Sequence, residues 1–262
     1  MAENESINKK LSAPSDVVQR EVGTLGLKER SGNIVEEARL DLRFPNCIRV
    51  YDEMEQNIVI ASALSIVNVI ASRTPHYIEA YSESEEDIKN KKFVEECFKD
   101  MTHTFDEFLR EALTVNKYGF SLHEKVFYFR RKENGSKYDD GKVGIKRLPI
   151  RSQSSVSKWK FNKSVRDLVG FYQKPPEERI GYDFGLINIP LDNSDGILIP
   201  RNRFLHFKDN STNGNPEGKS RLSSCYTHWR KLQQLLEAEE IASVKNLNGI
   251  PVVKIPALYM SE

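Results

Sequence analysis

The sequence predicts an α+β protein in which long helices pack on a β-rich middle region, and three observations support this fold class. Apolar residues recur at helical spacing in residues 51–72 and again in residues 93–117. Residues 120–208 contain short alternating runs separated by Asn, Asp and Gly, the pattern of strands joined by turns. Residues 220–248 have the pattern of a further long amphipathic helix.

The N-terminal region differs from the rest of the chain. Residues 1–40 are polar, contain three glycines and show no sustained periodicity. We interpret them as a flexible arm that stays disordered or becomes ordered by lying across a neighbouring subunit.

The folded core is expected to span residues 41–262. Its first helix, over residues 51–72, is apolar enough to predict burial on more than one side, and a strand is predicted to follow over residues 76–81.

Helical spacing returns after Ser84, because a serine followed by three acidic residues suits a helix N-terminus. A second helical segment begins at Phe105 and ends near Gly119, which we interpret as a left-handed C-cap. The remaining predicted elements are strands at 120–131, 143–145, 156–161, 168–172, 186–189, 197–199 and 204–207, a loop at 209–219, a helix at about 220–248 and a short strand between Pro251 and Pro256.

Composition excludes several classes of protein. The 262 residues include 39 Lys and Arg against 38 Asp and Glu, so a net charge of +1 gives no global attraction to nucleic acid or membrane. The longest apolar stretch, residues 58–71, is interrupted by polar residues and is shorter than the roughly 20 residues of a membrane-spanning helix. The N-terminus lacks the pattern of an export signal. Cys47, Cys97 and Cys225 are widely spaced, which predicts reduced thiols inside a cell.

The sequence contains no convincing catalytic, cofactor or metal site. The five histidines are scattered, and none has a second ligand at the spacing that places two side chains on one helix face. Gly218-Lys219-Ser220 is similar to the end of a phosphate-binding loop, but the first glycine of that motif would fall at Asn213. Ser220 is better explained as a helix N-cap. We therefore expect a protein that is not an enzyme and has no cofactor, with a nucleotide-dependent enzyme centred on Lys219 as a weaker alternative.

Charges are segregated along the chain. Residues 141–166 contain eight basic residues and no acidic residue, whereas residues 79–111 contain eleven acidic residues and five basic ones. Trp159 and Phe161 lie among the basic residues, as on surfaces that track phosphates and stack on bases. Three interpretations remain open: a solvated strand face, a contact between the basic and acidic segments of neighbouring subunits, and a contact with DNA. The candidate contact residues are Lys146, Arg147, Arg151, Lys158, Lys160 and Lys163.

Several short motifs follow one another in a characteristic order. They are Tyr118-Gly119-Phe120-Ser121 with Glu124, Leu148-Pro149-Ile150-Arg151, Trp159-Lys160-Phe161, His206-Phe207, the loop Gly214–Ser220 with Gly218 and Ser220, and a helix bearing Tyr226, Trp229 and Lys231, followed by Asn-Gly-Ile-Pro. Their order, over most of residues 50–256, resembles that of the portal proteins of tailed bacteriophages, in particular the Mu-like branch. No single motif is diagnostic, because several of them are also ordinary helix caps.

The resemblance implies a portal-like wing, a part of a structural subunit. Portal proteins form a dodecameric ring at one capsid vertex, through which the terminase motor pumps DNA and to which the tail adaptor binds. The implied partners are further copies of the chain, the major capsid protein, the terminase large subunit, the head–tail adaptor and double-stranded DNA, with no membrane. The implied location is the virion, and the host cytoplasm during assembly. The residues expected to have structural roles are Tyr118, Gly119, Phe120, Glu124, Gly218, Ser220 and Trp229.

Members of this family are considerably longer, and their stem, clip, channel loop and crown are expected largely beyond the last motif. We therefore interpret the chain as the wing-like N-terminal part of a portal, either a fragment of a longer product or one piece of a split one. The alternative function is a monomeric nucleic-acid-binding module that uses the basic segment 141–166.

Overall fold

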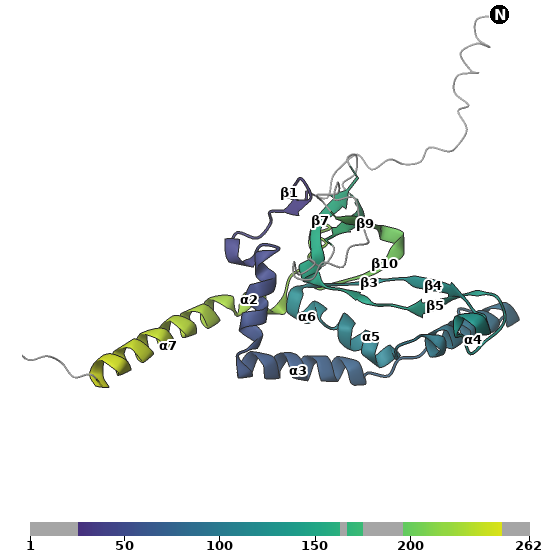
Figure 1. Ribbon diagram of the computed structural model, residues 1–262, viewed down its shortest axis with the longest axis horizontal. Coiled ribbons are helices and arrows are strands. Elements are labelled where there is room, and N and C mark those ends of the chain that lie inside the picture. The colour runs from purple at the N-terminus through teal and green to yellow at the C-terminus, as the bar shows by residue number, and fades with distance from the viewer. Residues whose placement is uncertain (1–25, 163–166, 175–195, 248–262) are drawn as a thin grey trace, which may run out of the picture.

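The computed structural model describes residues 26–162, 167–174 and 196–247 (Figure 1). It confirms the predicted mixed α+β class, because the helices lie beside small antiparallel sheets. The strands predicted at 186–189 and between Pro251 and Pro256 lie outside the described residues, as do residues 1–25 of the predicted arm.

The described chain begins with a packed segment, residues 26–44, which we call the N-terminal strap. Its short hairpin pairs β1 (Glu29–Arg30) with β2 (Asn33–Ile34). Leu27 is 1% exposed and Ile34 is 5% exposed, and both belong to the main core. The described part of the predicted flexible arm is therefore folded on the body, because two apolar side chains anchor an otherwise polar stretch.

The single helix predicted over residues 51–72 is in fact two helices. α2 (Asn46–Glu55) and α3 (Ile58–Arg73) meet at an angle of 97°. The side chain of Asn57 accepts hydrogen bonds from the first backbone N–H groups of α3, so a new helix starts there in a new direction. Among the described residues no single helix is long and apolar enough to cross a membrane, although α2 and α3 together meet that criterion as a bent pair.

The strand predicted at residues 76–81 does not form. The segment has no strand partner, and Tyr77 and Tyr81 are strongly exposed. Alternation of apolar and polar residues is not enough to form a strand when no edge of a sheet lies beside the segment to pair with it. The chain then reaches Ser84, whose hydroxyl accepts a hydrogen bond from the first turn of α4 (Glu85–Asp100), which confirms the predicted cap.

Two short helices lead into the central sheet. α5 (Phe105–Ala112) begins with a capping box formed by Thr104 and Glu107. α6 (Val115–Tyr118) ends at Gly119, whose φ of +91° confirms the predicted left-handed C-cap.

The strand predicted over residues 120–131 is divided between two sheets. β3 (Phe120–Glu124) is the central strand of a three-stranded sheet, between β10 (Phe204–Lys208) and β6 (Ile150–Arg151), and both pairings are antiparallel. The backbone N–H of Lys125 still donates to the carbonyl of Arg203, the residue before β10. From Val126 the chain pairs instead with residues 143–147.

The remaining strands form two further antiparallel sheets. β4 (Val126–Phe129) pairs with β5 (Val143–Arg147) in a two-stranded ribbon, which α4 contacts. β7 (Val156–Phe161), β8 (Leu168–Gln173) and β9 (Ile197–Pro200) form a three-stranded meander. Their positions match the strands predicted at 156–161, 168–172 and 197–199.

Three apolar clusters hold the body together. The main core lies where the meander meets the central sheet, and its members are Leu27, Ile34, Phe120, Leu122, Val156, Trp159, Phe171, Ile199 and Phe204. A second cluster surrounds α2 and includes Leu222 and Tyr226 from the C-terminal part, and a third lies under α5 around Phe108.

The long C-terminal helix, α7 (Tyr226–Leu247), begins later than the predicted position near residue 220. Ser220 does cap a helical turn, but that turn is a 3-10 segment, Arg221–Ser224, whose first N–H groups include that of Leu222. α7 then extends away from the body (Figure 1).

Candidate functional site

α3 has two apolar faces, and the described residues cover only one of them. On the inner face Leu64 is buried, and the Asn68 side chain accepts a hydrogen bond of 2.8 Å from Asn116 of α6. The opposite side exposes five aliphatic side chains within about 120° of the helix circumference at 3.6 residues per turn. We call it the outward face of α3, and it consists of Ile58, Val59, Ile66, Val69 and Ile70, which are 79%, 72%, 60%, 43% and 66% exposed.

The outward face of α3 has the chemistry of a contact surface. No charged residue occurs between Ile58 and Ser72. A surface helix of a monomer normally carries polar residues on its solvent side, and contiguous exposed apolar patches mark interaction sites. The sequence predicts burial on more than one side; in the structure the described residues bury one side and leave the outward face of α3 exposed, so burial of the second side stays a prediction.

α7 is exposed almost throughout. From Gln234 to Lys245 every described side chain is exposed. Helical segments of this length are marginal in water without packing, so the outer part of α7 is a second candidate contact surface. Its exposed aliphatic residues are Leu232, Leu235, Leu236, Ile241 and Val244.

A polar notch of about 790 Å³ lies between the corner of α2 and α3 and the first turns of α7. Trp229 lies at this notch and packs against the cluster around α2. Its indole N–H is buried and has no hydrogen-bond partner among the described residues. The other lining residues are Glu53, Gln56, Asn57, Ile58, Arg230, Gln233, Gln234 and Glu237.

The two motif glycines meet at one junction. A Cβ atom on Gly119 would lie 2.7 Å from the carbonyl oxygen of Glu217, and one on Gly218, whose φ is +58°, would lie 2.2 Å from the carbonyl oxygen of Gly119. Only glycine fits either position without a shift of the backbone. The junction closes the C-terminus of α6 with the loop that precedes α7.

The Gly218-Lys219-Ser220 turn uses its donors within the protein. The backbone N–H of Lys219 donates to the carbonyl of Asp209 over 2.8 Å, and the hydroxyl of Ser220 donates to the carbonyl of Lys117. A phosphate-binding loop needs such groups free to face a ligand. The turn therefore serves the junction with α6 instead of forming a phosphate cradle.

The other motif residues lie in and around the central sheet. Tyr118 donates its hydroxyl to Asp52 of α2 over 2.6 Å. Phe120 is 1% exposed and packs edge-on against Trp159. Glu124 accepts hydrogen bonds from the guanidinium of Arg151, which joins β3 to β6.

The basic segment is divided between different parts of the fold. Arg151 pairs with Glu124, whereas Lys146 and Arg147 are exposed on β5. Lys158 and Lys160 share one face of β7, with their ammonium groups 5.2 and 5.8 Å from the centre of the Tyr172 ring. Lys163 lies outside the described residues.

Trp159 is not the stacking platform that the sequence pattern suggested. It is 2% exposed, because side chains alternate along β7 and the tryptophan points to the core while its lysine neighbours point outward.

Part of the acidic segment is paired within the chain. Arg130 of the ribbon is fully buried, 2.7 Å from Glu96 of α4, and its guanidinium lies over the ring of Phe93.

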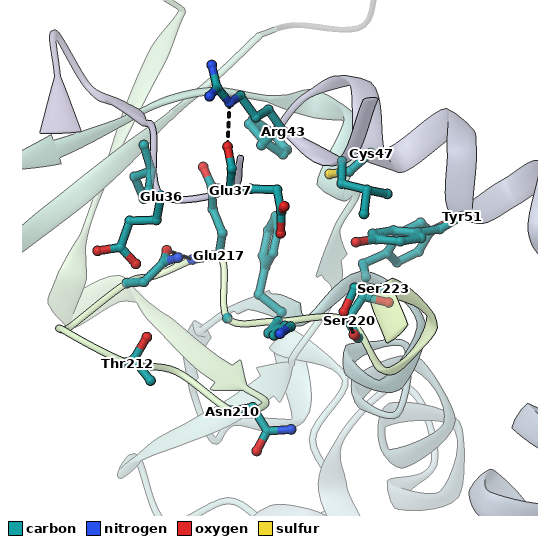
Figure 2. A pocket seen from close by; sticks show the side chains of 18 residues that line it. Glu36, Glu37, Arg43, Cys47, Tyr51, Asn210, Thr212, Glu217, Ser220 and Ser223 are labelled. Atoms are coloured by element: carbon teal, nitrogen blue, oxygen red, sulfur yellow. Dashed lines mark hydrogen bonds between the residues drawn. The ribbon is translucent and has the colours of Figure 1, made fainter. Parts of the chain in front are cut away.

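A cavity of about 270 Å³ lies between the N-terminal strap, the start of α2 and the loop before α7. Figure 2 shows Glu36, Glu37 and Glu217 on one side of it and Cys47 and Tyr51 on the other. Burial raises the pKa of Cys47 to about 12, so this thiol stays protonated and unreactive. Among the described residues no group of His, Cys, Asp and Glu side chains is arranged to hold a metal ion.

Glu217 is a half-buried acid that the sequence did not single out. Its Oε1 accepts a 3.1 Å hydrogen bond from the indole N–H of Trp159, but burial dominates and raises its pKa to about 7. His206 stacks on the other side of this network, against Trp159, with ring centroids 5.7 Å apart. Burial lowers the pKa of His206 to about 4, and its Nε2–H donates to the carbonyl of Pro216. The pKa shifts of Glu217 and His206 both depend on how the loop before α7 packs, and such packing leaves no pattern in the sequence.

The comparison with protein families identifies the chain. The family model described as the portal protein of Mu bacteriophage matches residues 48–254, well over half of the sequence and nearly all of the body described above. A search of curated proteins found no match. The extent of the family match, together with the order of the motifs along it, shows that the chain belongs to the Mu bacteriophage portal protein family, whose members are structural proteins of oligomeric, capsid-associated assemblies.

Proposed function

We propose that this protein is a subunit of the portal ring at one vertex of a phage capsid, where it forms part of the channel for DNA packaging and ejection. In this proposal the ring is a dodecamer that binds the terminase large subunit, the head–tail adaptor and the major capsid protein. It belongs to the virion, and to the host cytoplasm while the capsid is being assembled. The family match over residues 48–254 supports the proposal.

The observation that carries the proposal is the outward face of α3. A subunit of a closed ring must bury surface against a neighbour on each side. α3 offers five exposed aliphatic side chains and no charge, on a body that is otherwise packed around three clusters. We further propose that residues 41–262 correspond to the wing-like part of a portal subunit and that residues 1–40 form its N-terminal arm.

The basic residues retain a proposed contact role in this ring. In this proposal Lys146, Arg147, Lys158 and Lys160 contact a neighbouring subunit or the phosphates of DNA, which the exposure of Lys146 and Arg147 on β5 supports. Because Trp159 is buried, such a DNA contact would rest on charge and on Tyr172 alone. A role as a channel wall also requires no catalytic group, which agrees with the structural character of the family.

The proposal is tested by the assembly state of the purified 262-residue chain. Light scattering after size exclusion and electron microscopy should show rings for the wild type. Ile66→Asp should prevent them without changing the thermal unfolding temperature, because this side chain is 60% exposed in the monomer. Ile88→Asp is the matched control, since Ile88 is an exposed isoleucine on α4 and its variant should still form rings. A wild type that stays monomeric under all assembly conditions and is absent from phage particles would refute the proposal.

A further inference from the structure

Two helical surfaces that the described residues leave uncovered, the outward face of α3 and the outer part of α7, lie on opposite sides of one molecule. α3 and α7 leave the region of α2 in opposite directions (Figure 1). α7 therefore cannot cover α3 of its own copy. Each helix needs a partner from outside the described chain, and the family is one of oligomeric assemblies, so a second copy is available to both.

α7 carries a compact leucine face. At 3.6 residues per turn, Leu232, Leu235 and Leu236 fall within about 100° of the helix circumference. All three are exposed, by 42%, 67% and 49%. They lie on the other side of the helix from Gln233 and Glu237, which line the polar notch. The leucine face thus points away from the chain's own α2–α3 corner.

We propose that in the assembled ring the leucine face of α7 in one copy packs on the outward face of α3 in the next copy. This inference rests on the proposed function and specifies which surfaces join the subunits. The contact is heterologous, because it joins two different surfaces, and a repeated heterologous contact closes into a ring when its rotation allows. Helix-on-helix packing through interlocking aliphatic side chains suits both faces.

Charge favours α3 over a second α7 as the partner. Glu239 follows the leucines on the same side of α7, one turn further on, and Glu240 lies next to it. Two leucine faces packed in parallel would bring these carboxylates together between copies, which is repulsive. The outward face of α3 has no charge, and an antiparallel α7 would direct Glu239 toward the positive N-terminal end of α3.

Cysteine cross-linking tests the contact in the full 262-residue chain. The background is Cys225→Ser, which removes the exposed cysteine, since Cys47 and Cys97 are buried. The test variant adds Ile66→Cys and Leu236→Cys to one chain. The matched control combines Ile66→Cys with Gln234→Cys, because Gln234 is exposed but lines the notch instead of the leucine face. Each single variant is treated in parallel with an oxidant or a short bismaleimide, and electron microscopy checks for rings first.

The expected result is a ladder of covalent multimers from the test variant, with at least a tenfold lower yield from the matched control and from either single variant. Covalent dimers from Leu236→Cys alone would show α7 lying on α7 and would overturn the inference. Rings that give no ladder from the test variant would overturn it as well, and would leave the proposed function intact. Absence of rings from the wild-type chain would instead count against the proposed function on which the inference depends.

Discussion

Replacing Glu217 by Gln tests the physical account of the junction beside α7. The amide can still accept the hydrogen bond from Trp159, but it carries no charge at any pH. Burial raises the pKa of Glu217 from its ordinary 4.5 to about 7. At about 1.4 kcal/mol for each unit, ionised Glu217 costs the folded state up to about 3 kcal/mol.

The sign of the effect depends on which state binds protons more tightly. Folded Glu217 holds its proton more tightly than the unfolded chain does, so its contribution to stability is lost as pH rises from 4.5 to about 7. His206 acts in the opposite direction. Its pKa is lowered from 6.5 to about 4, so the unfolded chain binds the proton more tightly and stability rises with pH across that range. The two slopes oppose each other between pH 4.5 and 6.5.

Urea unfolding followed by tryptophan fluorescence, from pH 4 to pH 8, is the appropriate assay. Glu217→Gln should match the wild type near pH 4 and exceed it by up to about 3 kcal/mol at pH 8. Between these limits the variant should show the rising slope due to His206 and to His123, whose pKa burial also lowers. If the free energies of unfolding of the two proteins run parallel at all pH values, Glu217 is not held in a buried, proton-binding environment and the reasoning fails.

Three further substitutions probe other parts of the structure. Gly119→Ala should destabilise more than Gly135→Ala in thermal unfolding, because both glycines have positive φ but only the Gly119 site places a backbone oxygen against the new Cβ; equal losses would contradict the close approach. Lys158→Gln combined with Lys160→Gln should weaken binding to double-stranded DNA and reduce its log–log salt slope by about 2 if β7 contacts phosphates, and unchanged binding would leave these lysines a solvated face or a subunit contact. Arg130→Met should cost about 2 kcal/mol or more in urea unfolding, because this guanidinium is buried between aromatic rings; a loss below 0.5 kcal/mol would contradict that role.

Elements with strong local signals could be predicted from the sequence. Ser84 caps a helix with its own side chain, and Gly119 ends one because glycine tolerates the left-handed conformation. Neither prediction requires knowledge of distant chain segments. The meander strands β7 to β9 were also predictable, since each is a short run rich in β-branched, aromatic and other apolar residues. The family resemblance followed from the order of such local features and is confirmed by the family match.

Features that depend on distant segments could not be predicted. The corner at Asn57 interrupts an apolar pattern that continues on both sides of it, so the pattern resembles one helix. Residues 76–81 alternate as a strand would, but no strand edge lies beside them. The sequence around Trp159 is that of a basic surface, but Trp159 lies on the core face of β7, opposite its lysine neighbours. At the candidate site, the sequence indicated that α3 is too apolar, and the positions of α5 and α6 decided which side stays exposed.

The pairing of β3 with β10 affects how this protein folds during synthesis. Phe204 lies opposite Glu124, so the central strand receives one of its two partners only after about 80 further residues have been made. At a synthesis rate of about 5–20 residues per second, the first half of the chain waits roughly 4–16 s with that edge open. α2 is in the same position, because Leu222 and Tyr226 close its apolar cluster. A nascent chain in this interval exposes apolar surface and an unpaired strand edge together. Such a chain is prone to aggregation, and chaperones bind exposed surface of this kind.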